Sequence, residues 1–218
     1  MEKNVIYCLK YADAVLSEAW VFDGGNEDEM ILISYAIYLI KTADKMVLGD
    51  AGCDMLSEPD IKDFCSPMVV LRSIGVSEEE ITDIIITHAH YDHIQAVGYF
   101  KNAVIHISES EYQKGKEYIP EHMKVNSFQK ELIIDPQIKV IEWGGHSEGS
   151  SIIEIETDTQ THILAGDECY TNENINKKRC TGAFFSKEKA MEFVEEYGDR
   201  RYCVHTCHER SLITKRVI

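Results

Sequence analysis

Three histidines and one aspartate crowd into a single short segment of the chain. Residues 87–93 read THAHYDH and directly follow the apolar run Ile84, Ile85 and Ile86. Crowded imidazoles repel one another when protonated and desolvate one another when neutral, so the arrangement is costly unless something binds there. A divalent metal removes both costs, because neutral imidazole nitrogens and carboxylate oxygens are ligands that zinc prefers. The segment therefore predicts a metal site at the end of a strand.

The spacing within this segment indicates two metal sites rather than one. His88 and His90 fall on the same side of an extended segment. Asp92 and His93 follow a bend and can face a second point nearby. Isolated histidines are usually solvated or satisfied within the core, and we expect this of His106, His122 and His162.

The elements that position this segment alternate between strand-like and helix-like patterns. Period-two and β-branched runs predict strands at residues 5–9, 19–22, 31–41, 45–48, 83–87, 104–107, 138–143, 151–156, 162–165 and 201–205. Helical spacing with cap residues predicts helices at residues 67–74, near 94–100, from Ser108 onward and at 186–197. The polar stretch 114–130 is expected to be a surface excursion or a lid. We therefore predict an α/β fold with two mixed sheets between helices, in one domain over residues 1–218.

Three later segments also place a ligand-type residue at or near a strand end. His146 lies in a loop of small residues, Asp167 follows the strand at 162–165, and His205 ends the strand at 201–205. Sites are built where strand ends converge, so these residues are candidates to join the first cluster. His208 is an alternative to His205, and the strand-end position favours His205.

The order of these motifs resembles that of the metallo-β-lactamase superfamily. The resemblance rests on THAHYDH, on GGHSEGS at residues 144–150, on Gly166-Asp167 and on the strand-end histidine. It implies the αββα sandwich of that family and two divalent metals, with zinc expected and manganese, iron or cobalt equally suited to the ligands. It also implies a role for each residue: His88, His90 and His146 on one metal, Asp92, His93 and His205 on the other, Asp167 bridging them, and Asp50 orienting the site.

Within that superfamily, residues 166–174 resemble the N-acyl homoserine lactonase branch. Tyr170 stands three residues after the bridging aspartate, where that branch places a phenol against the substrate carbonyl, and Tyr91 matches an aromatic near the substrate. The chain departs from the branch at Glu148, where proline is common, and at Thr206, where aspartate commonly follows the last ligand histidine.

The resemblance implies a hydrolase that opens a lactone ring. Two bound metals would activate a water as hydroxide, which attacks the carbonyl carbon, while Tyr170 helps to stabilise the oxyanion. Asp92, Asp167 and Tyr170 are the catalytic residues expected from this mechanism, and Asp167 or a released water returns the proton. Gly-x-Ser-x-Gly is absent, so a serine nucleophile is not expected.

Other activities of the same scaffold remain as alternatives. They are thioester hydrolysis of the hydroxyacylglutathione type, cleavage of another ester or phosphoester, and, less favoured, an iron-dependent dioxygenase reaction. His90 argues against the flavodiiron proteins, which carry glutamate at that position.

The composition limits the partners. The formal net charge is −16, with 22 basic and 38 acidic residues, and this disfavours nucleic acid. The apolar run at residues 30–40 is too short and too polar to span a bilayer, and no signal peptide is expected. Seven cysteines without framework spacing indicate reduced thiols. We expect a cytoplasmic enzyme with a small-molecule substrate, no nucleic-acid or membrane partner, and a possible homodimer.

Overall fold

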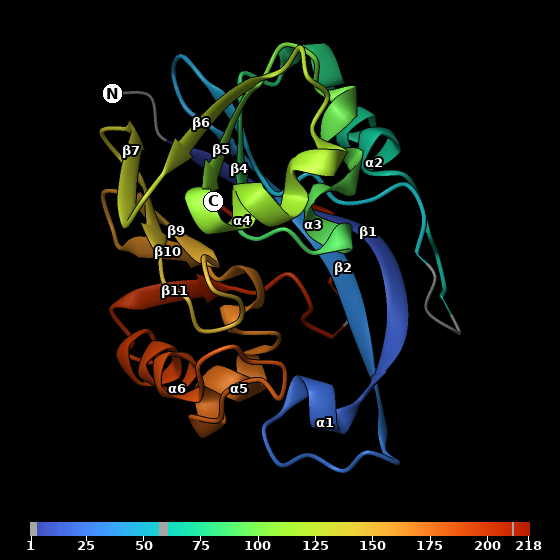
Figure 1. Cartoon of the computed structure of the whole chain (residues 1–218), viewed down its shortest axis with the longest axis vertical. Helices are drawn as coiled ribbons and strands as arrows, with labels where there is room; N and C mark the ends of the chain where they lie inside the picture. The colour runs from blue at the N-terminus through green and yellow to red at the C-terminus, as the bar shows by residue number, and fades with distance from the viewer. Residues whose placement is uncertain (1–3, 57–60, 211) are drawn as a thin grey trace.

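Two mixed β-sheets pack face to face between layers of helices. The computed structural model describes residues 4–56, 61–210 and 212–218, and Figure 1 shows the arrangement. The first sheet has the order β12-β1-β2-β3-β4-β5-β6, and the second has the order β11-β10-β9-β8-β7. The predicted αββα sandwich is confirmed.

The strands of the first sheet are β1 (Val5–Ser17), β2 (Met30–Lys41), β3 (Met46–Gly49), β4 (Asp83–Ile86), β5 (Val104–Ser108), β6 (Lys124–Phe128) and β12 (Lys215–Arg216). Those of the second are β7 (Glu131–Asp135), β8 (Ile138–Glu142), β9 (Ser151–Glu156), β10 (Thr161–Leu164) and β11 (Tyr202–His205). The α-helices are α1 (Glu18–Val21), α2 (Pro67–Ser73), α3 (Tyr91–Ile94), α4 (Glu109–Gly115), α5 (Asn172–Lys177) and α6 (Lys187–Glu196).

Alternation along the strands divides the core into three layers. In β4, Ile84 and Ile86 pack on the helical side with Leu71 of α2, whereas Ile85 packs between the sheets. A strand with both faces covered reads as a continuous apolar run, which is the pattern of residues 84–86. On the far side, Ile163 of β10 packs against Phe193 of α6. Each sheet therefore has one face against helices and one face against the other sheet.

Two predicted segments have a different structure. Residues 19–22 were expected to form a strand, but the β1–β2 pairing ends at Ser17 and the chain continues into α1. The Ser17 hydroxyl accepts a hydrogen bond from the Ala19 amide at 3.2 Å and so caps this helix. The expected excursion at 114–130 contains β6, which pairs with β5 and forms an edge of the first sheet. Residues 124–128 are thus part of the scaffold and not a lid.

The topology brings several strand ends to one place. β3 and β4 run parallel in the first sheet, and β10 and β11 run parallel in the second. The loops that leave these strands carry Asp50, residues 87–93, Asp167 and residues 206–208. The loop from β8 to β9 adds His146. Among the described residues no helix is long and apolar enough to cross a bilayer.

A buried carboxylate group also supports the start of β4. Asp83 Oδ1 lies 2.8 Å from His106 Nε2, and Asp83 Oδ2 lies 2.8 Å from Lys45 Nζ. Burial opposes ionisation, but the hydrogen bonds from His106 and Lys45 hold the pKa of Asp83 well below its usual value. A carboxylate with a depressed pKa stabilises the fold above its unfolded-state pKa, and this contribution is lost as the pH falls toward the folded-state value.

We therefore expect Asp83→Asn to lower the free energy of unfolding by about 2–4 kcal/mol at pH 7. The difference from the unsubstituted protein should shrink progressively below about pH 4, near the unfolded pKa of aspartate. Urea unfolding over a pH series measures this. Asp44→Asn, at an exposed position, is the matched control and should change stability by less than about 0.5 kcal/mol. A loss for Asp83→Asn that does not change with pH would contradict the assignment.

Candidate metal centre

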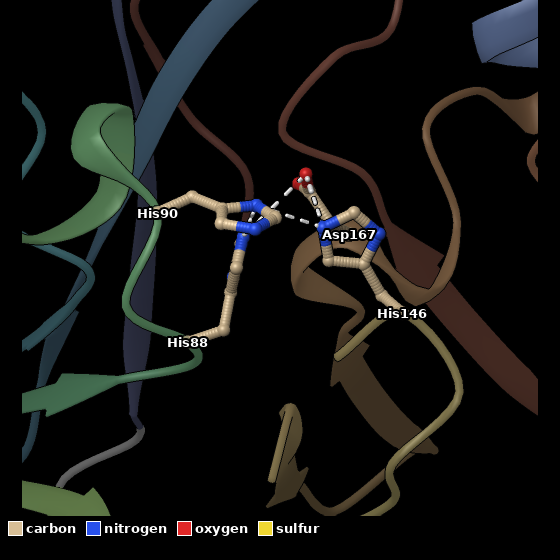
Figure 2. Close-up of side chains that lie close together, drawn as sticks. All are labelled: His88, His90, His146 and Asp167. Carbon is tan, nitrogen blue, oxygen red and sulfur yellow. Dashed lines mark hydrogen bonds and ion pairs between the residues drawn. The ribbon is translucent and has the colours of Figure 1, made fainter. Parts of the chain in front are cut away.

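One buried carboxylate lies between two groups of imidazoles. Asp167 follows β10, and its Oδ2 lies 3.4 Å from His146 Nε2 and 3.7 Å from His88 Nε2. His90 Nδ1 lies 3.0 Å from each of these two nitrogens. Figure 2 shows the four side chains converging from three separate loops. Their ligand atoms lie close enough together to hold one metal ion.

A second group faces the other oxygen of the same carboxylate. Asp167 Oδ1 lies 3.1 Å from His93 Nε2 and 3.2 Å from His208 Nε2. Asp92 Oδ2 lies 3.4 Å from His93 Nε2 and 3.6 Å from His208 Nε2. The sequence segment 87–93 thus supplies two residues to each group, as its spacing predicted. The shared carboxylate has the geometry of a bridging ligand.

The structure contradicts the prediction that His205 completes the second group. His205 lies opposite Leu164 in the β10–β11 pairing, and its Nε2 is 2.9 Å from His162 Nδ1. The chain turns after the strand, and Tyr38 donates a hydrogen bond to the Thr206 carbonyl at 2.9 Å. This turn carries His208, rather than His205, to Asp167. A strand-end position alone could not show that the next three residues would fold back over the site.

Hydrogen bonds at the far side of three rings determine which nitrogen faces the centre. His93 Nδ1 lies 2.8 Å from Asp50 Oδ2, His146 Nδ1 lies 2.8 Å from the Ala183 carbonyl, and His208 Nδ1 lies 3.1 Å from the Ser34 carbonyl. An imidazole that donates from Nδ1 to an oxygen presents the lone pair of Nε2 on its other side, as metal-binding histidines do. Asp50 thus has the orienting contact that the sequence predicted.

One nitrogen provides a direct test of whether a metal fits here. His93 Nε2 is buried and has no hydrogen-bond partner, although oxygens of Asp92 and Asp167 lie around it. A buried polar atom without a partner costs about 1–3 kcal/mol. The set of donors, imidazole nitrogens and carboxylate oxygens, suits zinc and similar divalent ions. The residues present therefore fit two divalent metals.

The electrostatics of the buried groups favour cations. Asp50, Asp92 and Asp167 approach one another around His93. Burial acts to lower the pKa of His93, but these carboxylates raise it well above its usual value. Burial opposes ionisation of Asp167 too, but the nearby imidazoles of His93 and His208 hold its pKa well below the usual range. The centre is therefore negatively charged unless cations enter it.

Two buried glutamates that the sequence reading missed hold the ligand loops together. Glu111 of α4 accepts hydrogen bonds from the Ala89 amide at 2.9 Å and from the Gly149 amide at 3.0 Å. Glu168 accepts from the His146 amide at 3.2 Å and from the Ser150 hydroxyl. In the sequence, Glu111 resembles an ordinary acidic residue in a first helical turn, and Glu168 resembles a neighbour of Asp167. Only their burial distinguishes them.

A pocket of about 390 Å³ opens beside the first group of ligands. Tyr170 lines this pocket, with its ring centroid 6.0 Å from that of His146 and 5.0 Å from that of His208. Burial, and next the Asp167 charge, raise the pKa of the Tyr170 phenol, which keeps its hydroxyl a proton donor. The remaining walls are apolar and polar side chains: Trp20, Ala183, Phe184, Phe185, His90, Lys114, His146, Ser147 and Glu148. Tyr91 is absent from this lining and packs against Tyr118.

Comparison with known proteins places this geometry in a family. The family model described as "Metallo-beta-lactamase superfamily" matches residues 33–202. The chain therefore belongs to the metallo-β-lactamase superfamily, as its motifs indicated.

Individual relatives extend the comparison. An N-acyl homoserine lactonase of Bacillus thuringiensis is 28% identical over an alignment of 134 residues that covers 58% of this chain and 53% of the lactonase. The chain thus spans about half the length of the curated relatives it matches first. Its fold is similar to that of an N-acyl homoserine lactone hydrolase with N-hexanoyl-L-homoserine at its catalytic metal centre, with a TM-score of 0.80, 21% identity and coverage of 96% and 94%. It is also similar to AidC, a dizinc quorum-quenching lactonase, with a TM-score of 0.76, 18% identity and coverage of 96% and 89%.

Paired substitutions of the two C-terminal histidines test the corrected assignment. For the hydrolysis proposed below, we expect His208→Ala to lower the rate of metal-loaded protein by at least about 100-fold, because it removes a proposed direct ligand. Loss of an outer partner costs about 10–100-fold. His205→Ala should retain far more activity than His208→Ala, because it removes no side chain that contacts Asp167. Steady-state kinetics at saturating zinc measures both. The reverse pattern, with His205→Ala inactive and His208→Ala active, would restore the first prediction.

Proposed function

We propose that this protein is a metal-dependent hydrolase that opens the ring of a lactone, of the N-acyl homoserine lactone class. The proposal rests on the position of the Asp167 carboxylate, which has one oxygen facing each of the two ligand groups. The Tyr170 ring lies beside a histidine of each group. The similar proteins named above are lactonases or lactone hydrolases, which supports the same reaction.

The two ligand groups define where metals would be held. His88, His90 and His146 would bind one ion, and Asp92, His93 and His208 would bind the other, with Asp167 shared. Zinc is the ion we propose, since the ligands suit it and a similar lactonase is described as dizinc. When bound, such ions supply Lewis acidity and a water whose pKa is lowered toward neutrality.

The side chains around the metals have separate tasks in this reaction. Tyr170 lines the pocket, and its hydroxyl would donate a hydrogen bond to the substrate carbonyl as negative charge develops on it. Asp167 and Asp92 are the carboxylates that can accept the proton released on attack and return it to the leaving alkoxide. Asp92 is the more accessible of the two, with 21% of its side chain exposed against 4% for Asp167.

The rest of the pocket matches a small amphiphilic molecule. Trp20 and Phe185 are 60% and 65% exposed, which is unusual for such large apolar side chains, and both line the pocket. Lys114 and Ser147 lie on the same lining and provide polar contacts. An apolar chain attached to a polar ring would find both kinds of surface within one pocket of about 390 Å³.

Removal of the phenol hydroxyl tests the role of Tyr170. We expect Tyr170→Phe to lower kcat for a lactone by about 100-fold with a smaller change in KM, because one preorganised donor to the oxyanion is lost. Bound metal should be unchanged, and its measurement shows whether the centre remains intact. An unchanged kcat would remove Tyr170 from the proposed mechanism.

A substrate panel tests the reaction itself. Zinc-loaded protein should open N-acyl homoserine lactones with kcat/KM of at least about 10⁴ M⁻¹s⁻¹, as an enzyme does with its own substrate. Glutathione thioesters and phosphoesters should react at least about 100-fold more slowly, and treatment with a chelator should abolish the activity. Protein that opens no lactone but cleaves a thioester or a phosphoester would overturn the lactonase proposal and favour the corresponding alternative.

A further inference from the structure

A second cluster of metal-ligand side chains lies on β10 and β11, and the reaction above does not use it. His162 and Cys203 face each other in the parallel pairing, and His205 follows Cys203 on the same face of β11. One ligand atom from each of the three residues lies within 4.8 Å of the other two. None of the three is among the groups around Asp167.

The two imidazoles of this cluster are already aligned. Their ring planes differ by 2°, and His162 Nδ1 lies 2.9 Å from His205 Nε2. Two neutral imidazoles at this distance share one N–H···N hydrogen bond, which accounts for the pair by itself. It does not account for a thiol beside them.

The surroundings keep the three ligand groups uncharged: burial raises the pKa of the Cys203 thiol, although its contact with Gln160 acts in the opposite direction. Burial, and next His162, lower the pKa of His205 to about 4, and burial lowers the pKa of His162, so both rings are neutral near pH 7. His162 is buried, whereas Cys203 and His205 are half-buried on an edge strand. Lys215 is the one positively charged group among the described groups that shift the pKa of His205. Its charge opposes the binding of a cation there.

We propose that His162, Cys203 and His205 form a third metal site, separate from the catalytic centre, that binds a zinc ion. Tetrahedral zinc with bonds of about 2.0–2.1 Å to nitrogen holds two such nitrogens about 3.3 Å apart. The observed 2.9 Å then requires the rings to separate by a few tenths of an ångström. On binding, the Cys203 sulfur loses its proton to the solvent and becomes the thiolate ligand. The proton of the N–H···N bond moves to the other nitrogen of the ring that carries it, and two N–Zn bonds replace the hydrogen bond.

The position suggests what the ion would do. β11 is a four-residue edge strand that pairs only with β10 among the described strands. A metal shared between these strands would tie β11 to the sheet. The same strand leads into residues 206–208, which present His208 to the catalytic centre. We therefore assign this site a structural role. The assignment does not depend on which substrate the catalytic centre uses.

Cobalt substitution of the full chain provides the test, because a Co²⁺–thiolate bond gives a charge-transfer band in the near ultraviolet that imidazole and carboxylate ligands do not give. We expect cobalt-loaded protein to show this band and to bind a third equivalent of metal. Cys203→Ser should lose the band, and both Cys203→Ser and His162→Asn should lose about one equivalent of metal and one zinc-released proton per chain.

Two cysteine variants make the result specific. Cys65 is a half-buried free thiol outside the cluster, so Cys65→Ser is the matched control and should keep the band. Cys207 Sγ lies 3.3 Å from Asp167 Oδ1, so Cys207→Ser tests the catalytic centre as the origin of the band. Loss of the band in Cys207→Ser with retention in Cys203→Ser would overturn the proposal. A total of two metals per chain with no thiolate band would also overturn it.

Discussion

The centre of this structure depends on a buried negative charge that must be compensated. Asp167 lies at the end of β10 with four imidazoles around its two oxygens, and Asp50 and Asp92 add further carboxylates nearby. Uncompensated charges of this kind are too costly to bury, whereas charges that coordinate metals are not. The loops that converge here are consequently shaped to hold ligands rather than to pack side chains.

Precision at the centre comes from groups one layer further out. The Asp50 carboxylate accepts a hydrogen bond from the Thr87 amide at 2.7 Å and contacts His93. The backbone of Asp50 has a positive φ of 65°. A left-handed aspartate is uncommon and marks a position where the backbone is shaped for a contact. Glu111 and Glu168 similarly connect the ligand loops of different strands. Substitution of such buried carboxylates should disturb ligand geometry without touching a metal directly.

The correct predictions share a local cause. The alternation in residues 84–86, the clustering in residues 87–93 and the Gly-rich loop around His146 are each a pattern confined to a few neighbouring residues.

The incorrect predictions share a different cause. Residues 19–22 are apolar enough for a strand, but the end of the β1–β2 pairing and the Ser17 cap decide that they form a helix. Residues 124–128 are polar, and they form a strand because β5 offers an open edge.

His205 and His208 show most clearly which features the sequence determines and which depend on the tertiary structure. By itself the sequence determined the types of ligand, the two-site spacing of residues 87–93 and the superfamily, because coordination chemistry restricts which residues can bind a metal and how closely they can follow one another. Only the tertiary structure decided that His208 faces Asp167 while His205 faces His162. That choice depends on the turn at 206–207 and on the Ser34 carbonyl, which lies 174 residues away along the chain. Contacts between such distant segments leave no local pattern, so the fold alone could assign each histidine to its site.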